Sequence, residues 1–131
     1  MILNKTQILE ALDLKSEAVD VPEWGGSVLV RTMTGADRDA FEASLIVTQL
    51  DGTRKPNMTN MRAKLVALTV VDEAGALVFD VTDVDRLSLK SASALERVFT
   101  VAQRINGLGA AAEENAAKNS VAGPSAGSTS A

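Results

Sequence analysis

The composition of the chain changes abruptly after Gly107, and this change limits how much of the sequence can fold. Up to Ile105, apolar residues recur at the spacings of helices and strands, whereas the end of the chain is rich in Ala, Gly and Ser. Such small side chains bury too little surface to offset about 1–2 kcal/mol of backbone entropy per residue. The sequence therefore predicts one folded domain over residues 1–106 and a flexible, disordered tail over residues 107–131.

The first third of the domain carries the pattern of a helix followed by a β-hairpin. A short helix is expected over residues 4–12, with Asn4 or Thr6 as its cap and an apolar stripe on one face (Ile8, Leu9 and Leu12). Extended segments at residues 17–21 and 27–33 flank the sequence Pro-Glu-Trp-Gly-Gly. Because Pro sets φ and the Gly pair permits positive φ, this sequence predicts a turn between two paired strands.

The rest of the domain is predicted to be mainly helical. Sequences resembling a capping box begin at Thr34, Thr82 and Ser93, and they predict helices that end near Leu50, Leu89 and Ile105. A further helix is expected from Asn57 or Thr59 to Val71, with a loop before it at residues 51–56 and a short strand after it at residues 76–79. The predicted fold is therefore α+β, with a small antiparallel hairpin or three-stranded sheet and about four helices.

Charge and residue types exclude most chemistry. The net charge is −4 and the chain contains no Cys and no His. An acidic chain repels phosphate, so nucleic-acid binding is not expected. Catalytic triads and the usual zinc sites need residues that the chain lacks, and no phosphate-binding glycine loop is present. We therefore expect a protein that is not an enzyme and that uses no cofactor and no metal.

Acidic residues cluster at three places, where they could in principle bind a divalent cation. The spacing of an EF-hand and its terminal Glu are missing, and several of these residues stand at predicted helix starts. We assign them to helix N-termini and solvated turns. The three clusters are Asp37 with Asp39, Asp80 with Asp83 and Asp85, and Glu113 with Glu114.

Apolar side chains provide the candidates for binding. Trp24 lies in the predicted turn, and the sequence leaves open whether it anchors a partner or covers the hairpin. The apolar stripe of the last helix is assigned to the core, and the helix from Met61 to Val71 is expected to offer exposed apolar positions to a partner. The expected contact surface consists of Trp24, Met61, Leu65 and Leu68.

The order of these motifs resembles a known family. Residues 21–42 contain a Pro-x-Trp-Gly-Gly turn, a strand and a helix start of the form Thr-Gly-x-x-Arg. Residues 62–72, and residues 83–106 with the helix Ser-Ala-Leu-Glu-Arg-Val-Phe, continue the pattern. Residues 21–42 resemble the N-terminal half of the tail assembly chaperones of siphophages, and the two later segments also resemble that family. The likeness covers most of residues 1–106 and is looser in the tail.

This resemblance implies a function. Such chaperones bind the long, helical, aggregation-prone tape-measure protein, keep it soluble and help to recruit tail-tube subunits, and they are absent from the finished virion. In many phages a translational frameshift adds a C-terminal extension, so residues 107–131 would be the end of a short form. From the residues alone, the tail is equally compatible with a tolerated disordered end or with a tether that folds on binding.

A structural subunit of the virion, in the tail tube or the head–tail connector, is the alternative. The sequence lacks the long strand-rich pattern of a tube barrel, which favours the chaperone. We expect the protein to stay in the host cytoplasm, because no apolar leader and no run of about 18 apolar residues is seen. No membrane partner is expected, and weak self-association is left open.

Overall fold

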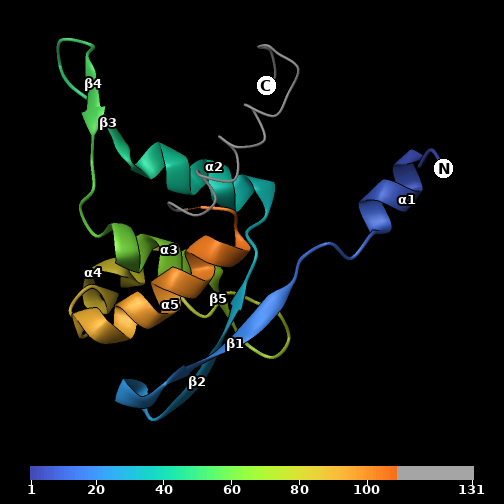
Figure 1. Cartoon of the computed structure of the whole chain (residues 1–131). Coiled ribbons are helices and arrows are strands. Elements are labelled where there is room, and N and C mark those ends of the chain that lie inside the picture. The colour runs from blue at the N-terminus through green and yellow to red at the C-terminus, as the bar shows by residue number, and fades with distance from the viewer. Residues whose placement is uncertain (109–131) are drawn as a thin grey trace, which may run out of the picture.

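The structure is a computed structural model that describes residues 1–108, and these residues form the predicted α+β fold (Figure 1). Most of the predicted tail, with Glu113 and Glu114, lies outside the described residues. The helices are α1 (Lys5–Glu10), α2 (Gly35–Ser44), α3 (Met61–Thr69), α4 (Val84–Leu87) and α5 (Ala92–Ile105), with 3₁₀ turns η1 (Pro22–Trp24) and η2 (Val81–Asp83). The strands are β1 (Ser16–Val21), β2 (Gly26–Arg31), β3 (Ile46–Thr48), β4 (Arg54–Pro56) and β5 (Val70–Val71).

The predicted hairpin is confirmed as strands β1 and β2. They pair antiparallel from Ser16 opposite Arg31 to Val21 opposite Gly26, and η1 with Gly25 closes the turn. Gly25 has φ +77°, a conformation that favours glycine. Strand β5 pairs with β2, so that the sheet order is β1-β2-β5.

The core lies where α5 and α3 pack together and against this sheet. Helix α5 contacts both β1 and β2, and α3 packs along α5. The predicted core stripe of α5 is confirmed, since four of its residues are buried and Ile105 is partly buried against them. Aliphatic side chains dominate this interior, and its fully buried members include Val21, Val30, Leu65, Val66 and Val98.

Helix α5 ends at the predicted glycine. Gly107 has φ +69°; its N–H donates to the carbonyl of Arg104, and the N–H of Leu108 donates to the carbonyl of Gln103. These two bonds form a Schellman motif, which satisfies the last carbonyls of the helix. Leu108 then packs against the core.

The helix predicted from Thr34 to Leu50 is too long. Helix α2 ends at Ser44, and β3 pairs with β4 in a second hairpin that includes the segment predicted as a loop. The β-branched sequence Ile46-Val47-Thr48 favours an extended backbone, and Gly52 with φ +87° permits the turn. Figure 1 shows this β3–β4 hairpin extending away from the packed helices.

Two predicted capping boxes are displaced. The box assigned to Thr82 belongs to Asp80 and Asp83, which begin η2. The cap assigned to Ser93 belongs to Ser91, whose Oγ accepts from the N–H of Ala94. In both cases an equivalent polar residue two positions earlier occupies the turn before the helix, and local sequence does not distinguish the two.

Smaller differences concern the ends of the chain's other elements. Asn4 and Gln7 form a complete capping box, but α1 ends at Glu10, so Leu12 lies beyond it. Helix α3 begins only at Met61, after Asn60 in the left-handed conformation. The strand predicted at residues 76–79 is reduced to one bridge between Val71 and Leu77.

A substitution in the core tests this packing. Leu65 has no exposed surface, so Leu65→Ala leaves a cavity and should lower the free energy of unfolding by about 2–5 kcal/mol in urea denaturation. Leu50→Ala removes an equally large side chain that is fully exposed, and it should change stability by less than about 0.5 kcal/mol. Equal effects of the two variants would contradict the core described above.

Candidate partner-binding surface

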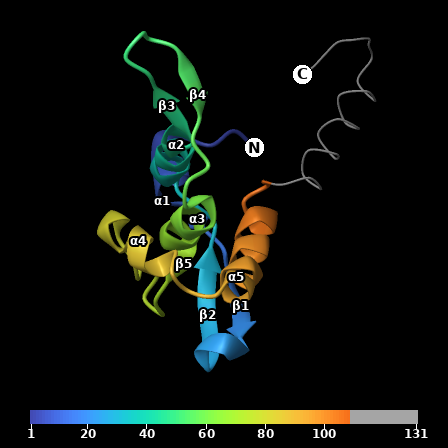
Figure 2. The same ribbon diagram turned by 90° about the vertical axis from the view of Figure 1, so that its left-hand side faces the viewer.

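An apolar groove runs along the exposed face of α3. Its floor is formed by Ala67 and Leu68, and α2 provides one wall with Ala40 and Ser44. The segment from Leu77 to Asp85 provides the other wall, and the hollow has a volume of about 740 Å³. Figure 2 shows α2 and α4 on two sides of α3.

The groove is apolar because its second wall exposes large side chains. Leu77, Phe79, Val81 and Val84 line this wall, and Val81 is 83% exposed. Monomeric soluble proteins rarely leave contiguous apolar surface of this kind unless it binds something. From here on, "the groove" means Leu68 together with these four residues.

Polar residues form the rim of the groove, and each is held by bonds within the chain. The Lys64 Nζ donates to the carbonyl of Ser44 at 3.1 Å, and Asn60 Nδ2 donates to Asp85 at 3.1 Å. Hydrogen bonds from the hydroxyl and the N–H of Thr82 lower the pKa of Asp80 below its usual 3.8. The rim therefore carries fixed negative charge on the wall of η2 and α4 and positive charge near α2.

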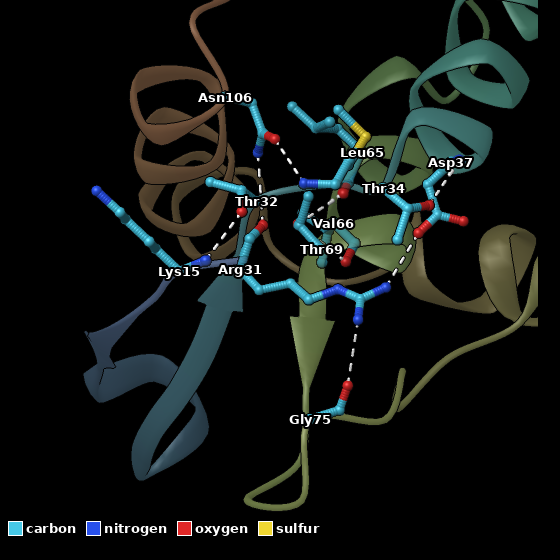
Figure 3. Close-up of polar contacts among 11 residues, drawn as sticks. Lys15, Arg31, Thr32, Thr34, Asp37, Leu65, Val66, Thr69, Gly75 and Asn106 are labelled. Atoms are coloured by element: carbon cyan, nitrogen blue, oxygen red, sulfur yellow. Dashed lines mark hydrogen bonds and ion pairs between the residues drawn. The ribbon is translucent and has the colours of Figure 1, made fainter. Parts of the chain in front are cut away.

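The position of α2 depends on contacts at the end of β2, shown in Figure 3. Arg31 donates to Asp37 at 3.0 Å and to the carbonyl of Gly75 at 3.3 Å. The Oγ1 of Thr34 accepts from the N–H of Asp37 and caps α2. These bonds hold the start of α2 and the turn that leads into the second wall of the groove.

Trp24 borders a second hollow that adjoins the groove. This hollow, about 590 Å³, is lined by Trp24, Val78, Leu87 and Leu89, and Phe79 separates it from the groove because it lines both. Trp24 is half-buried and packs against the core. It therefore covers the end of the hairpin and remains partly exposed to solvent.

Met61 borders a third hollow, at the N-terminal end of α3. It is half-buried there beside the exposed Met58, and Arg62 pairs with Glu96 at 2.6 Å on the rim. The guanidinium of Arg62 also lies 5.4 Å from the ring centre of Phe99. The lining of this hollow is more polar than the lining of the groove.

The structure places the four predicted contact residues in four different surroundings. Leu68 lies in the groove, Trp24 and Met61 border the neighbouring hollows, and Leu65 is fully buried, so it has no surface to offer a partner. Residues 77–84 were missed as contact residues because their spacing predicts a strand and a helix, and local spacing does not reveal exposure. The one sequence signal for an exposed contact residue was Val81, a large apolar residue directly before the capping box predicted at Thr82.

The described residues offer little for other chemistry. Among residues 1–108 no group of three or more His, Cys, Asp or Glu side chains could hold a metal ion. Asp37 pairs with Arg31, and Asp80 and Asp83 cap η2. No helix of the described part of the chain is long and apolar enough to cross a membrane. The apolar lining of the groove is of the kind that suits contact with another apolar segment.

Comparison with known families decides the identity. The sequence pattern of the phage tail assembly chaperones matches residues 5–119 of the 131. The chain belongs to this family. Its fold is similar to that of the bacteriophage HK97 tail assembly chaperone, with a TM-score of 0.55 and 16% identity over 80% of this chain and 95% of that chain. Among curated proteins, no sequence matches it.

The family resemblance seen in the sequence is therefore confirmed, and the structure explains the residues that carried it. In this tail assembly chaperone, the Pro-x-Trp-Gly-Gly sequence forms η1 and the tight turn of the hairpin. The Thr-Gly-x-x-Arg sequence starts α2, where Thr34 caps the helix and Arg38 donates to the carbonyl of Asn106 at 3.1 Å. Both motifs position elements of the fold.

The chaperone holds Trp24 in place partly through Glu23, which predicts a pH effect. Arg97 donates to Glu23 at 2.9 Å and Ser93 at 3.1 Å. The backbone hydrogen bond of Glu23, followed by those of Arg97 and Ser93, lowers its pKa below the usual 4.5. A lowered pKa means that the stabilisation is present above pH 4.5 and is lost as the pH falls through the lower folded value.

We expect the midpoint of thermal unfolding, followed by Trp24 fluorescence, to fall as the pH drops below 4.5. Glu23→Gln should remove this part of the pH dependence. It should lower the midpoint of thermal unfolding mainly at neutral pH, where the wild type has the full stabilisation. The control is Glu73→Gln, which replaces an exposed carboxylate on the turn after β5 and should retain the wild-type profile. A Glu23→Gln profile identical to the wild type would contradict the role given to this contact.

Proposed function

We propose that this tail assembly chaperone binds a helical segment of the tape-measure protein in the groove and keeps that protein soluble. The observation that carries the proposal is the uncovered apolar wall around Val81, next to Leu68 on the floor. A chaperone that delays aggregation must cover apolar surface of its client, and it needs apolar surface of its own to do so. Membership of a chaperone family supports a non-catalytic role.

The groove suits a helix better than an extended strand. Its floor is one face of α3, and its two walls are side chains from helices and turns, so no free strand edge lies along it. An amphipathic helix places residues at i, i+3, i+4 and i+7 into such a groove. The tape-measure protein, as the family resemblance implies, is long and helical, so it can offer this pattern.

Recruitment of tail-tube subunits belongs to the same proposal. The chain is acidic, with a net charge of −4, which keeps a protein with uncovered apolar surface in solution.

We place the protein in the host cytoplasm during assembly and outside the finished virion. Mass spectrometry of purified virions separates this role from that of a tail-tube or connector subunit, which would be present there in many copies.

The direct test is co-expression of the chaperone with the tape-measure protein of the same phage. Leu68→Asp and Val81→Asp each place a carboxylate in the groove, and burial of an unpaired charge is costly. We expect the soluble fraction of the tape-measure protein to fall roughly tenfold with either variant. Leu50→Asp places the same charge on the tip of the β3–β4 hairpin and should retain the wild-type yield.

Circular dichroism should show that all three variants are folded. Equal solubilisation of the tape-measure protein by the wild type and by both groove variants would contradict the proposal. Trp24→Ala, measured in the same assay, tests whether the neighbouring hollow contributes. Unchanged solubilisation would assign Trp24 to the structure of the hairpin alone.

A further inference from the structure

The hollow beside Trp24 differs from the groove in its charge. Arg86 and Lys90 belong to its lining, together with one carboxylate, Asp83. The Oδ2 of Asp83 accepts from the N–H of Asp80 at 3.0 Å, so this carboxylate is engaged in the cap of η2. The lining is therefore positive in a chain whose net charge is −4. From here on, "the Trp24 hollow" means Trp24, Val78 and Leu89 together with Arg86 and Lys90.

The two cations of the Trp24 hollow have no carboxylate partner within residues 1–108. Five arginines of this part of the chain each form an ion pair, whereas Arg86 and Lys90 form none there, and both are exposed. A single cation of this kind is ordinary on a protein surface. Two of them at the edge of one apolar hollow attract an acidic ligand that also has apolar side chains.

The apolar part of the Trp24 hollow is uncovered and held in place. Val78 is 51% exposed and Leu89 is 84% exposed. The turn that carries Trp24 is fixed beside the start of α5, because Glu23 accepts from Ser93 at 3.1 Å. A half-buried aromatic side chain on a fixed turn, next to exposed aliphatic side chains, is typical of a binding hot spot.

The adjoining groove has an acidic wall. Asp80 and Asp85 both line it, and Lys64 lies by the opposite wall. The side chain of Asp85 accepts from the amide of Asn60, and that of Asp80 accepts from Thr82. Neutral donors satisfy both carboxylates without cancelling their charge, so the wall stays negative.

One segment of the chain, residues 77–89, separates the two sites. Val78 lines only the Trp24 hollow, while its neighbour Phe79 lines both sites. Further along the segment, Asp85 lines the groove and the next residue, Arg86, lines the hollow. A ligand that covers this segment therefore meets negative charge on one side and positive charge on the other.

We propose that the groove and the Trp24 hollow together select a client helix by the distribution of its charges, with basic residues beside the groove and acidic residues beside the hollow. The inference rests on the proposed function and adds the chemistry of the client. An apolar groove alone accepts any apolar helix, whereas like charges placed side by side reject the wrong ones. A client that enters in the opposite direction meets like charges at both ends, so its charges also set its direction.

The fluorescence of Trp24 tests this selection, because it is the only tryptophan of the chain. The probes are two amphipathic helical peptides without Trp, with the same composition and the same apolar residues at i, i+3, i+4 and i+7. One has all its Glu in the first half and all its Lys in the second, and the other has Glu and Lys evenly mixed. The full-length wild type should bind the segregated peptide roughly five- to tenfold more tightly at low salt. Its Trp24 emission should shift to shorter wavelength as the hollow is covered.

Two double variants make a matched pair for this titration. Arg86→Glu with Lys90→Glu should abolish the preference for the segregated peptide. Arg54→Glu with Lys55→Glu changes the net charge equally on exposed positions of β4 and should retain the preference. Circular dichroism should show that both are folded, since all four positions are exposed.

Three results of the titration would overturn the inference. The first is a wild type that binds both peptides equally or binds neither. The second is an equal loss of preference in the two double variants. The third is binding of the segregated peptide without any change in the emission of Trp24.

The co-expression assay separates this inference from the proposed function. Arg86→Glu with Lys90→Glu should lower the soluble fraction of the tape-measure protein roughly five- to tenfold, and the β4 pair should retain the wild-type yield. A retained yield with the first pair, alongside a loss with Leu68→Asp and Val81→Asp, would overturn the inference and leave the proposed function standing. A retained yield with both groove variants would refute the proposed function, and the peptide titration would then decide the charge selection by itself.

Discussion

The junction at Asn106 is the contact on which the arrangement of the chaperone depends. The side-chain oxygen of Asn106 accepts from the N–H of Met33 at 2.7 Å, and its amide donates to the carbonyl of Ala102 at 2.9 Å. It thereby joins the end of α5 to the chain leaving β2, where Arg31 reaches Asp37 and the turn at Gly75 (Figure 3). The Arg31 Nε is buried without a partner in the described structure, a cost of about 1–3 kcal/mol. The bonds around it must outweigh this cost, which makes the junction a fixed point from which α2 and the groove wall extend.

A rigid junction matters because the groove has no single element that defines it. Its floor belongs to α3, one wall to α2, and the other to the segment around Val81. Packing of α3 on α5 places the floor, and the bonds of Arg31 place both walls relative to it. The groove can therefore stay open without a ligand, since polar contacts at its ends hold the walls apart while the apolar side chains between them remain uncovered. Preorganisation of this kind reduces the entropy that binding must overcome.

Much of the fold could be predicted because its signals are local. The hairpin at Gly25 and the stop of α5 at Gly107 each depend on a glycine that must adopt positive φ, and both predictions are confirmed. The end of α2 was mispredicted because the residues after Ser44 fit a helix by spacing, and only their pairing with β4 makes them a strand. The contact surface was harder still. Leu65 and Leu68 stand three positions apart on a helix that is apolar around much of its circumference, and only the packing of α5 decides that Leu65 is buried while Leu68 lines the groove.

The residue types of the chain determine how such a surface can be controlled. With no His, no side chain has an ordinary pKa between pH 5 and 8, and with no Cys there is no thiol to oxidise. Apolar contacts in the groove respond to neither signal, and their occupancy depends on the concentration and the affinity of the ligands that compete for it. Under the proposed function, the occupancy of the groove therefore follows the concentration of free client and the affinity of that client for the groove.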